Sequence, residues 1–290
     1  MRSVACITAI LLASAGSAAA APGPNEPVAQ PFAGTVVEPE IDCHPTERRP
    51  NPVVVLPGGD GSTGDTAADW ATVVTALRAA GYCTLIFQGG VVNEKRWAGD
   101  IPTGARQTAD FIARVRERTG AERVDLVAHS VGTVVANYFL KVLRGAPQVA
   151  HAVLLAPEAR DCDGAGLLAP LGIENPPITP GRALREMPFL AAGLTELSPE
   201  LALAVQLTPQ SPVYHAIFDG PIAQPGVRYS VLASRHDEFA TPPETCSIII
   251  EPGVTMDFYE DRFPGAAPVG HSALRSSVHT AGWVLEQLAR

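Results

Sequence analysis

The segment Val-Ala-His-Ser-Val-Gly at residues 127–132 carries the clearest chemical signature of this sequence, because it sets a serine between an apolar run and an amphipathic one. A serine lies on a sharp turn from a strand into a helix when the residues two positions before and after it are small, usually as G-x-S-x-G. Here Ala128 replaces the first glycine, and its methyl group is small enough for that turn. We expect Ser130 to be a nucleophile; the alternative is a serine that only caps the helix.

A serine hydroxyl needs a base to become reactive, and the base needs an acid to orient it. After a serine on this kind of turn, the acid comes first along the chain and the histidine last. His271 lies in a Pro- and Gly-rich loop between the last predicted strand and the last predicted helix, where its ring can reach Ser130. Other histidines fit less well, since His151 begins a buried strand, His215 precedes the expected acid and His279 lies inside the final helix.

The orienting acid should lie in a loop after the strand that precedes the histidine loop. Asp237 occupies this position and is the acid that we expect. The alternatives follow the preceding strand and are Glu158, Asp161 and Asp163. We expect Glu238, the neighbour of Asp237, to stay solvated or to make a local ion pair.

Acyl transfer places negative charge on the carbonyl oxygen, and each backbone N–H group that stabilises this charge contributes roughly 3 kcal/mol. One donor should be Val131, at the start of the predicted helix. The other should be Gly59, in the Leu-Pro-Gly-Gly loop after an apolar strand. A phosphate-binding loop is the weaker alternative, because the lysine of G-x-x-x-x-G-K-[ST] and the spacing of G-x-G-x-x-G are both missing. The pattern implies no cofactor and no metal.

Short apolar runs alternate with longer amphipathic segments, which predicts an α/β fold with a mostly parallel central sheet flanked by helices. Runs that are apolar at nearly every position are typical of strands buried on both faces. The expected strands cover residues 53–56, 83–87, 124–128, 151–155, 227–233 and, closer to the edge, 254–259. The expected helices cover residues 65–80, 103–119, 132–143 and 272–289, the last burying Leu274, Val278, Trp283, Leu285 and Leu288.

Residues 158–211 break the alternation and are rich in Pro, Gly and Leu, with a helix expected near residues 199–207. We interpret this stretch as a cap-like insertion over one end of the sheet. Its apolar side chains either face lipid or pack as an ordinary core; they are Leu167, Leu168, Leu171, Phe189, Leu190 and Leu194.

The first residues have the composition of an export signal, with Arg2, an apolar run and then small residues. We expect a signal peptide at residues 1–20, a leader and N-terminal segment at 21–50, and one domain at 51–290. The apolar run is too short for an ordinary transmembrane helix, so an uncleaved anchor is the weaker alternative. The sequence therefore predicts a secreted, extracellular protein.

Cysteine usage agrees with export. Of five cysteines, Cys6 lies in the expected signal, and the other four favour two disulfides over free thiols in an oxidising compartment. Three pairings are possible. We favour Cys43–Cys83, since each precedes a predicted strand and should lie at one edge of the sheet, and Cys162–Cys246 then follows by elimination.

The formal net charge of −9, without a cluster of Lys or Arg, argues against nucleic-acid binding, because such a surface repels phosphate backbones. The hydrophobic fraction of 46% suffices for a large core. We expect a monomer whose partner is a small-molecule or lipid ester, with transient contact to a lipid surface.

Taken together, these segments resemble the secreted bacterial class 2 lipases, which are lipases and esterases of the α/β-hydrolase superfamily. The likeness runs from residue 52 to the end, and its motifs are Val-Val-Val-Leu-Pro-Gly-Gly, Gly-Tyr-Cys at 81–83 and residues 125–130, 227–238 and 270–271. It implies an α/β-hydrolase fold and a triad of Ser130, Asp237 and His271. It also supports the Cys43–Cys83 pairing.

Three positions depart from that pattern: Pro57 stands where a histidine is usual, His236 where a tyrosine is common and Phe263 where a cysteine is common. The expected function is hydrolysis of carboxylic esters through an acyl-enzyme. The alternatives are an exported serine peptidase or acyltransferase with the same triad, and a non-catalytic surface-binding protein. The intact order of serine, acid and histidine argues against the last.

Overall fold

A six-stranded parallel sheet in the order β3-β2-β5-β6-β7-β8 forms the centre of the computed structural model. The structure describes residues 34–165, 168, 172–173, 176–187, 189–190 and 202–290, so the predicted signal peptide lies outside the described residues. The strands are β2 (Val53–Leu56), β3 (Thr84–Ile86), β5 (Val124–His129), β6 (Val149–Leu155), β7 (Arg228–Ala233) and β8 (Val254–Phe258). The prediction of an α/β fold with a parallel sheet is therefore confirmed.

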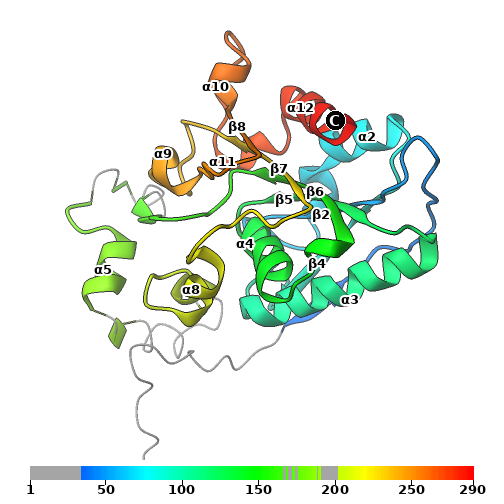
Figure 1. Ribbon diagram of the computed structural model, residues 1–290. Coiled ribbons are helices and arrows are strands. Elements are labelled where there is room, and N and C mark those ends of the chain that lie inside the picture. Colours follow the sequence, from blue (N-terminus) through cyan, green and yellow to red (C-terminus); the bar gives the residue numbers. More distant parts are fainter. Residues whose placement is uncertain (1–33, 166–167, 169–171, 174–175, 188, 191–201) are drawn as a thin grey trace, which may run out of the picture.

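Helices cover both faces of this sheet (Figure 1). On one face lie α2 (Ala71–Ala79) and α12 (Val278–Ala289), and on the other α3 (Ile101–Thr119) and α4 (Val131–Asn137), which continues as a π-helical turn at Tyr138–Val142. Successive residues of β2 point to opposite faces, so Val53 and Val55 join one apolar core while Val54 and Leu56 join the other. This burial on both sides explains why the strands are continuously apolar.

The remaining elements are short. A second, two-stranded antiparallel sheet pairs β1 (Thr35–Val37) with β4 (Gln88–Val91), and the sequence patterns did not predict it. The other helices are α1 (Thr66–Asp69), the 3-10 turn at Ala146–Gln148, α5 (Pro180–Glu186), α7 (Ala202–Gln206), α8 (Pro212–Phe218), α9 (Pro243–Cys246), α10 (Tyr259–Arg262) and α11 (His271–Leu274).

Two predicted helices are interrupted. The helix expected at 65–80 breaks at Trp70, whose buried indole packs edge-on against the ring of His129. The helix expected at 272–289 is divided into α11 and α12, because Ser277 leaves the helix and caps α12 by accepting hydrogen bonds from two backbone amides. The prediction that Val278 is buried is wrong: it is the first residue of α12 and is 71% exposed.

Both expected disulfides are present in the structure. Cys43 is bonded to Cys83, with a Cα–Cα distance of 5.2 Å, and Cys162 is bonded to Cys246, with a Cα–Cα distance of 4.5 Å. The second bond joins the segment after β6 to α9, which follows β7. It therefore ties the start of the predicted insertion to α9.

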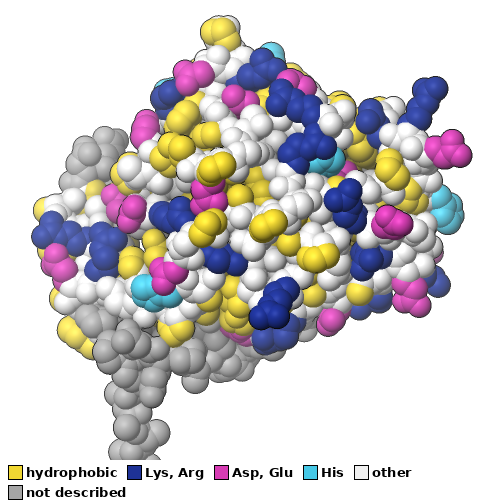
Figure 2. Space-filling model, in the orientation of Figure 1, with side chains coloured by type: hydrophobic (Ala, Val, Ile, Leu, Met, Phe, Trp, Pro, Cys, Tyr) yellow, Lys and Arg dark blue, Asp and Glu magenta, His cyan; other side chains and the backbone are white. Residues whose placement is uncertain are grey.

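The outer surface mixes both charge signs. Figure 2 shows acidic and basic side chains interspersed with apolar ones over the face that is in view. Within the described residues, no helix combines the length and apolar character needed to cross a bilayer.

Candidate active site

Ser130 occupies a strained turn between β5 and α4. Its φ of +53° is unusual for a residue with a side chain, and such strain is typical of functional positions. The turn is held because the backbone N–H and the hydroxyl of Thr133 both donate to the carbonyl of Ser130, at 2.8 and 2.6 Å. A glycine is required two residues after Ser130, because a Cβ on Gly132 would lie 2.5 Å from the Pro57 carbonyl oxygen. Two residues before Ser130, the fully buried Ala128 shows that this position tolerates a methyl group.

His271 and Asp237 form a buried pair at the same end of the sheet. The Nδ1 atom of His271 lies 2.8 Å from Oδ2 of Asp237. The other carboxylate oxygen accepts from the backbone N–H groups of Phe239 and Ala240, at 2.8 and 2.7 Å, which fixes its orientation. The sequence-predicted base and acid therefore contact each other.

The pair changes the proton affinity of both groups. Burial by itself would raise the pKa of Asp237, but the hydrogen bond and charge of His271 and two backbone amides hold that pKa below its ordinary value. Burial by itself would lower the pKa of His271, but the carboxylate of Asp237 raises it above its ordinary value. An ionised carboxylate that stabilises an imidazolium is the arrangement a general base requires.

Glu238 is exposed, as expected, and it also contacts the histidine segment. Although the side chain is exposed, its Oε2 accepts a hydrogen bond of 2.9 Å from the backbone N–H of His271. The exposed side chain agrees with the prediction of a solvated residue, whereas its hydrogen bond to His271 was not predicted. This bond forms because His271 begins α11, where the backbone N–H groups lack partners within the helix and attract a carboxylate.

Glu158 lies beside the serine. The Ser130 hydroxyl donates to Glu158 Oε1 at 3.2 Å, and among the described residues no hydrogen bond joins it to His271. The two side chains meet because β5 and β6 are neighbours, with His129 opposite Leu155 at their carboxyl ends. Glu158, weighed as an acid for the histidine, thus contacts the expected nucleophile instead.

The loop after β2 packs directly on the serine turn. A Cβ on Gly58 would lie 3.0 Å from the Cβ of Ser130, and one on Gly59 would lie 3.1 Å from Cγ1 of Val131. The N–H of Val131 opens α4 and has no partner within that helix. The two amides expected to hold an oxyanion therefore belong to adjoining segments beside Ser130.

Two side chains that sequence reasoning missed hold this loop in place. Arg96 donates from Nε to the Gly58 carbonyl at 2.9 Å and from a guanidinium nitrogen to the Asp60 carbonyl at 3.1 Å. Trp97 donates from its indole N–H to the Pro57 carbonyl at 2.6 Å. Both lie in a loop after β4 that contains no recognisable motif, so no sequence signal could have identified them.

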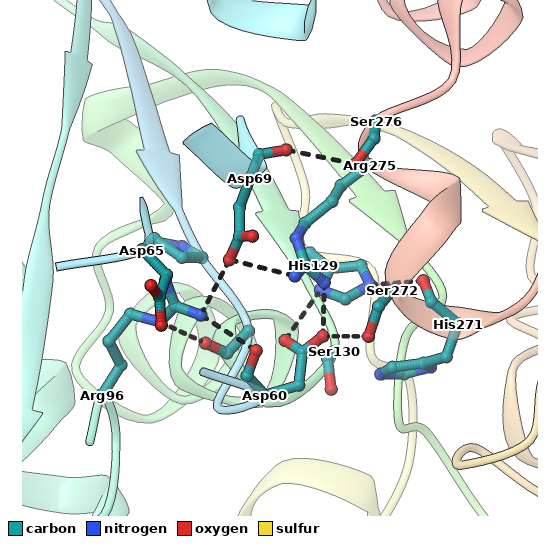
Figure 3. A network of polar contacts seen from close by, with 12 residues as sticks. Asp60, Asp65, Asp69, Arg96, His129, Ser130, His271, Ser272, Arg275 and Ser276 are labelled. Carbon is teal, nitrogen blue, oxygen red and sulfur yellow. Dashed lines mark hydrogen bonds and ion pairs between the residues drawn. The ribbon is translucent and has the colours of Figure 1, made fainter. Parts of the chain in front are cut away.

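Asp60 connects the loop to the histidine segment (Figure 3). Its Oδ2 accepts from the Ser272 hydroxyl and from the Arg275 guanidinium, both in the segment that begins with His271. Its Oδ1 lies 3.8 Å from Nδ1 of His129, whose Nε2 donates to the carbonyl of His271 at 3.0 Å. Figure 3 shows these side chains converging between the serine turn and α11, so one polar network joins three parts of the site.

Burial influences both ionisable groups at the centre of this network. It would raise the pKa of Asp60, but His129, Arg275 and Ser272 lower that pKa to about 2. Burial, together with the nearby His271, lowers the pKa of His129 to about 3, so this ring is neutral near pH 7. Because His129 is then uncharged, Arg275 is the cation that pairs with Asp60.

A cavity of about 440 Å³ opens at the serine. Its described lining includes Ser130, His271, Glu158 and Gly59. Apolar side chains from the predicted insertion also line it: Leu184, Leu203 and Leu207. Of the apolar residues named in the insertion, Leu167, Leu171 and Leu194 lie outside the described residues, and Phe189 is 71% exposed.

Known structures share this architecture. The protein designated Rv0554 from Mycobacterium tuberculosis is 20% identical, with 87% of this chain and 92% of that chain covered and a TM-score of 0.52. Epoxide Hydrolase A from Mycobacterium thermoresistibile is 15% identical, with coverages of 87% and 93% and a TM-score of 0.51. At these identities the likeness shows the fold alone.

A comparison with a family profile shows membership of a family as well as the fold. The profile of the Alpha/beta hydrolase family matches residues 53–284, which include the strand–turn–helix around Ser130, the Asp237 loop and the His271 segment. A match over most of the chain establishes membership. This protein belongs to the alpha/beta hydrolase family.

Proposed function

We propose that this protein is a secreted carboxylic-ester hydrolase, a lipase or esterase similar to the bacterial class 2 lipases. The observation that carries the proposal is the His271–Asp237 pair, buried in the same cavity as a serine with positive φ. In this proposal Ser130 is the nucleophile, His271 the base and Asp237 the orienting acid. Gly59 and Val131 supply the oxyanion-stabilising amides.

The reaction would proceed in two halves. Ser130 Oγ attacks the ester carbonyl carbon while Nε2 of His271 accepts the hydroxyl proton, and the resulting oxyanion is held by the two amides. The alcohol leaves with the proton that His271 returns. Water then attacks the acyl-enzyme, again giving its proton to His271, and the carboxylic acid departs as the serine hydroxyl is restored.

The cavity suits an uncharged ester with an apolar acyl group. Leucine side chains contribute to the lining, so the transfer of an alkyl chain from water into the cavity is favourable. The exposed Phe189 and Ile178 of the insertion support transient contact with a lipid surface. Lipase and esterase activity are distinguished by comparing emulsified triglycerides with soluble esters.

Two disulfides and the signal-like residues 1–20 support export to an oxidising compartment. The Cys43–Cys83 bond and the β1–β4 pairing attach the N-terminal segment to the hydrolase domain proposed at 51–290. The net charge of −9 supports a protein without a nucleic-acid partner. We propose that it acts as a monomer.

A fluorophosphonate probe tests the proposal, because it reacts with activated serines. We expect the wild-type protein to be labelled and Ser130→Ala to be unlabelled. The exposed Ser276 provides a matched control, and Ser276→Ala should label like the wild type. Hydrolysis of p-nitrophenyl esters without cleavage of peptides would support the ester hydrolase, whereas peptide cleavage that depends on Ser130 would indicate a peptidase.

A further inference from the structure

Glu158 is an ionisable group at the site that the proposed mechanism does not use. It follows β6 by way of Ala156, a residue with a positive φ of +43°, and this turn directs the chain toward the serine. Its Oε1 accepts the hydroxyl of Ser130 at 3.2 Å, and its side chain lines the cavity. Within the described residues, the serine is its one hydrogen-bond partner and no lysine or arginine pairs with it.

The surroundings of this carboxyl group favour its neutral form more than water does. A carboxylate removed from water without a cation loses its hydration, and the group takes up a proton instead. Burial accordingly raises the pKa of Glu158, and its interactions with His271 and the serine hydroxyl oppose this increase only in part. The neutral acid can still accept a hydrogen bond from the serine hydroxyl.

We propose that Glu158 is a further catalytic residue, a neutral carboxylic acid that holds the Ser130 hydroxyl in the free enzyme and must stay protonated for acyl transfer to be fast. This inference rests on the proposed function, since it concerns the same serine. It adds to that function a second carboxyl group, besides Asp237, that acts on the reaction.

The physical reason is the strength of the hydrogen bond from the serine. A carboxylate accepts a hydroxyl about twice as strongly as a neutral acid does, so ionised Glu158 would stabilise the hydroxyl before attack. Acyl transfer creates an oxyanion and an imidazolium at the same time, so the effects of a nearby carboxylate on these two charges largely cancel. The stronger hydrogen bond in the ground state remains and slows attack, by about tenfold.

The other charged groups around Glu158 do not produce this loss at high pH. His271 becomes neutral as pH rises, which favours its role as base. The pKa values of Asp237 and Asp60 are both lowered, so these carboxylates are already ionised near pH 7. The remaining charged residues of the cavity lining are Lys95, Arg96 and Asp163.

The pH dependence of kcat/KM for a soluble p-nitrophenyl ester tests the proposal with Glu158→Gln, which keeps a hydrogen-bonding side chain of the same size but cannot ionise. We expect wild-type kcat/KM to fall about tenfold on the alkaline side. Glu158→Gln should lack the alkaline decline, so that the ratio of its kcat/KM near pH 7 to its kcat/KM at alkaline pH is close to one. The exposed Glu244 gives a matched control, and Glu244→Gln should keep the wild-type profile.

An infrared difference spectrum between wild type and Glu158→Gln reads the proton without relying on catalysis. We expect a protonated-carboxyl band near pH 7 that disappears as pH rises through the alkaline limb. Absence of the band, an unchanged alkaline decline in Glu158→Gln, or loss of activity at every pH would overturn the proposal. A protonated Glu158 beside a serine that no probe labels would instead remove the proposed esterase function.

Discussion

The ring of His271 and the carboxylate of Asp237 lie 2.8 Å apart, although 34 residues separate them along the chain. Strand order makes this contact possible, because β7 delivers Asp237 and the chain returns through β8 before reaching His271. A buried carboxylate with three hydrogen-bond donors has little freedom to turn. The imidazole is therefore held with Nδ1 toward the acid and Nε2 available for a proton.

Replacing the orienting acid should affect catalysis much more than binding. In Asp237→Asn the carboxylate that stabilises the imidazolium is lost, and we expect kcat to fall by about 10³–10⁴-fold while KM changes little. Steady-state kinetics with a soluble ester measure both constants. A loss of less than tenfold would mean that another group orients His271.

The rise of kcat/KM with pH on the acid side should reflect the deprotonation of His271. The base must be unprotonated to accept the serine proton, and Asp237 raises its pKa, so kcat/KM should rise with pH through a midpoint above the ordinary histidine value of about 6.5. In Asp237→Asn that midpoint should move downward. If this midpoint is the same in Asp237→Asn as in the wild type, the rise in kcat/KM with pH reports a group other than His271.

The network around Asp60 should stabilise the fold in a pH-dependent manner. Its pKa is lowered to about 2, so its contribution is complete above the unfolded pKa near 3.8 and is lost as pH falls toward 2. We expect Asp60→Asn to lower the free energy of unfolding by about 2 kcal/mol near pH 7. Urea denaturation at several pH values measures this difference, which should shrink below pH 4. If the difference in free energy of unfolding does not depend on pH, the lowered pKa of Asp60 is not the source of this stabilisation.

Gly132 should not tolerate a side chain. A Cβ there would meet the backbone carbonyl oxygens of Pro57 and Leu56 at 2.5 and 2.6 Å, and this clash can be relieved only by moving α4 or the loop after β2. We expect Gly132→Ala to lower the free energy of unfolding by about 1–3 kcal/mol and to reduce kcat. Gly282, on an open face of α12, is the control, and Gly282→Ala should stabilise the protein by about 0.5–1 kcal/mol. Equal effects at both positions would argue against the close approach.

The sheet could be predicted from the sequence because its strands have a simple pattern of apolar residues. Strands buried on both faces are continuously apolar, and the strand–serine–helix turn has a compact local signature. The order of acid and histidine along the chain then led to Asp237 and His271. Their contact in the structure agrees with that reasoning.

The rest of the site depends on contacts that have no local pattern. Arg96 and Trp97 hold the loop after β2 from a segment without a motif, and Asp60 reaches Arg275 across 215 positions of sequence. Glu158 was noted as an acid near the right strand, but only the pairing of β5 with β6 shows that it faces the serine. Val278 was misplaced because its apolar type hides its position at the exposed start of α12.

The acyl-enzyme on Ser130 can be detected by intact-mass spectrometry and peptide mapping after acid quenching, early in turnover of a p-nitrophenyl ester. We expect a burst of p-nitrophenol and a covalent acyl group on the peptide that contains Ser130, with neither seen in Ser130→Ala. Ester cleavage without a covalent intermediate, or an acyl group on another residue, would contradict this expectation.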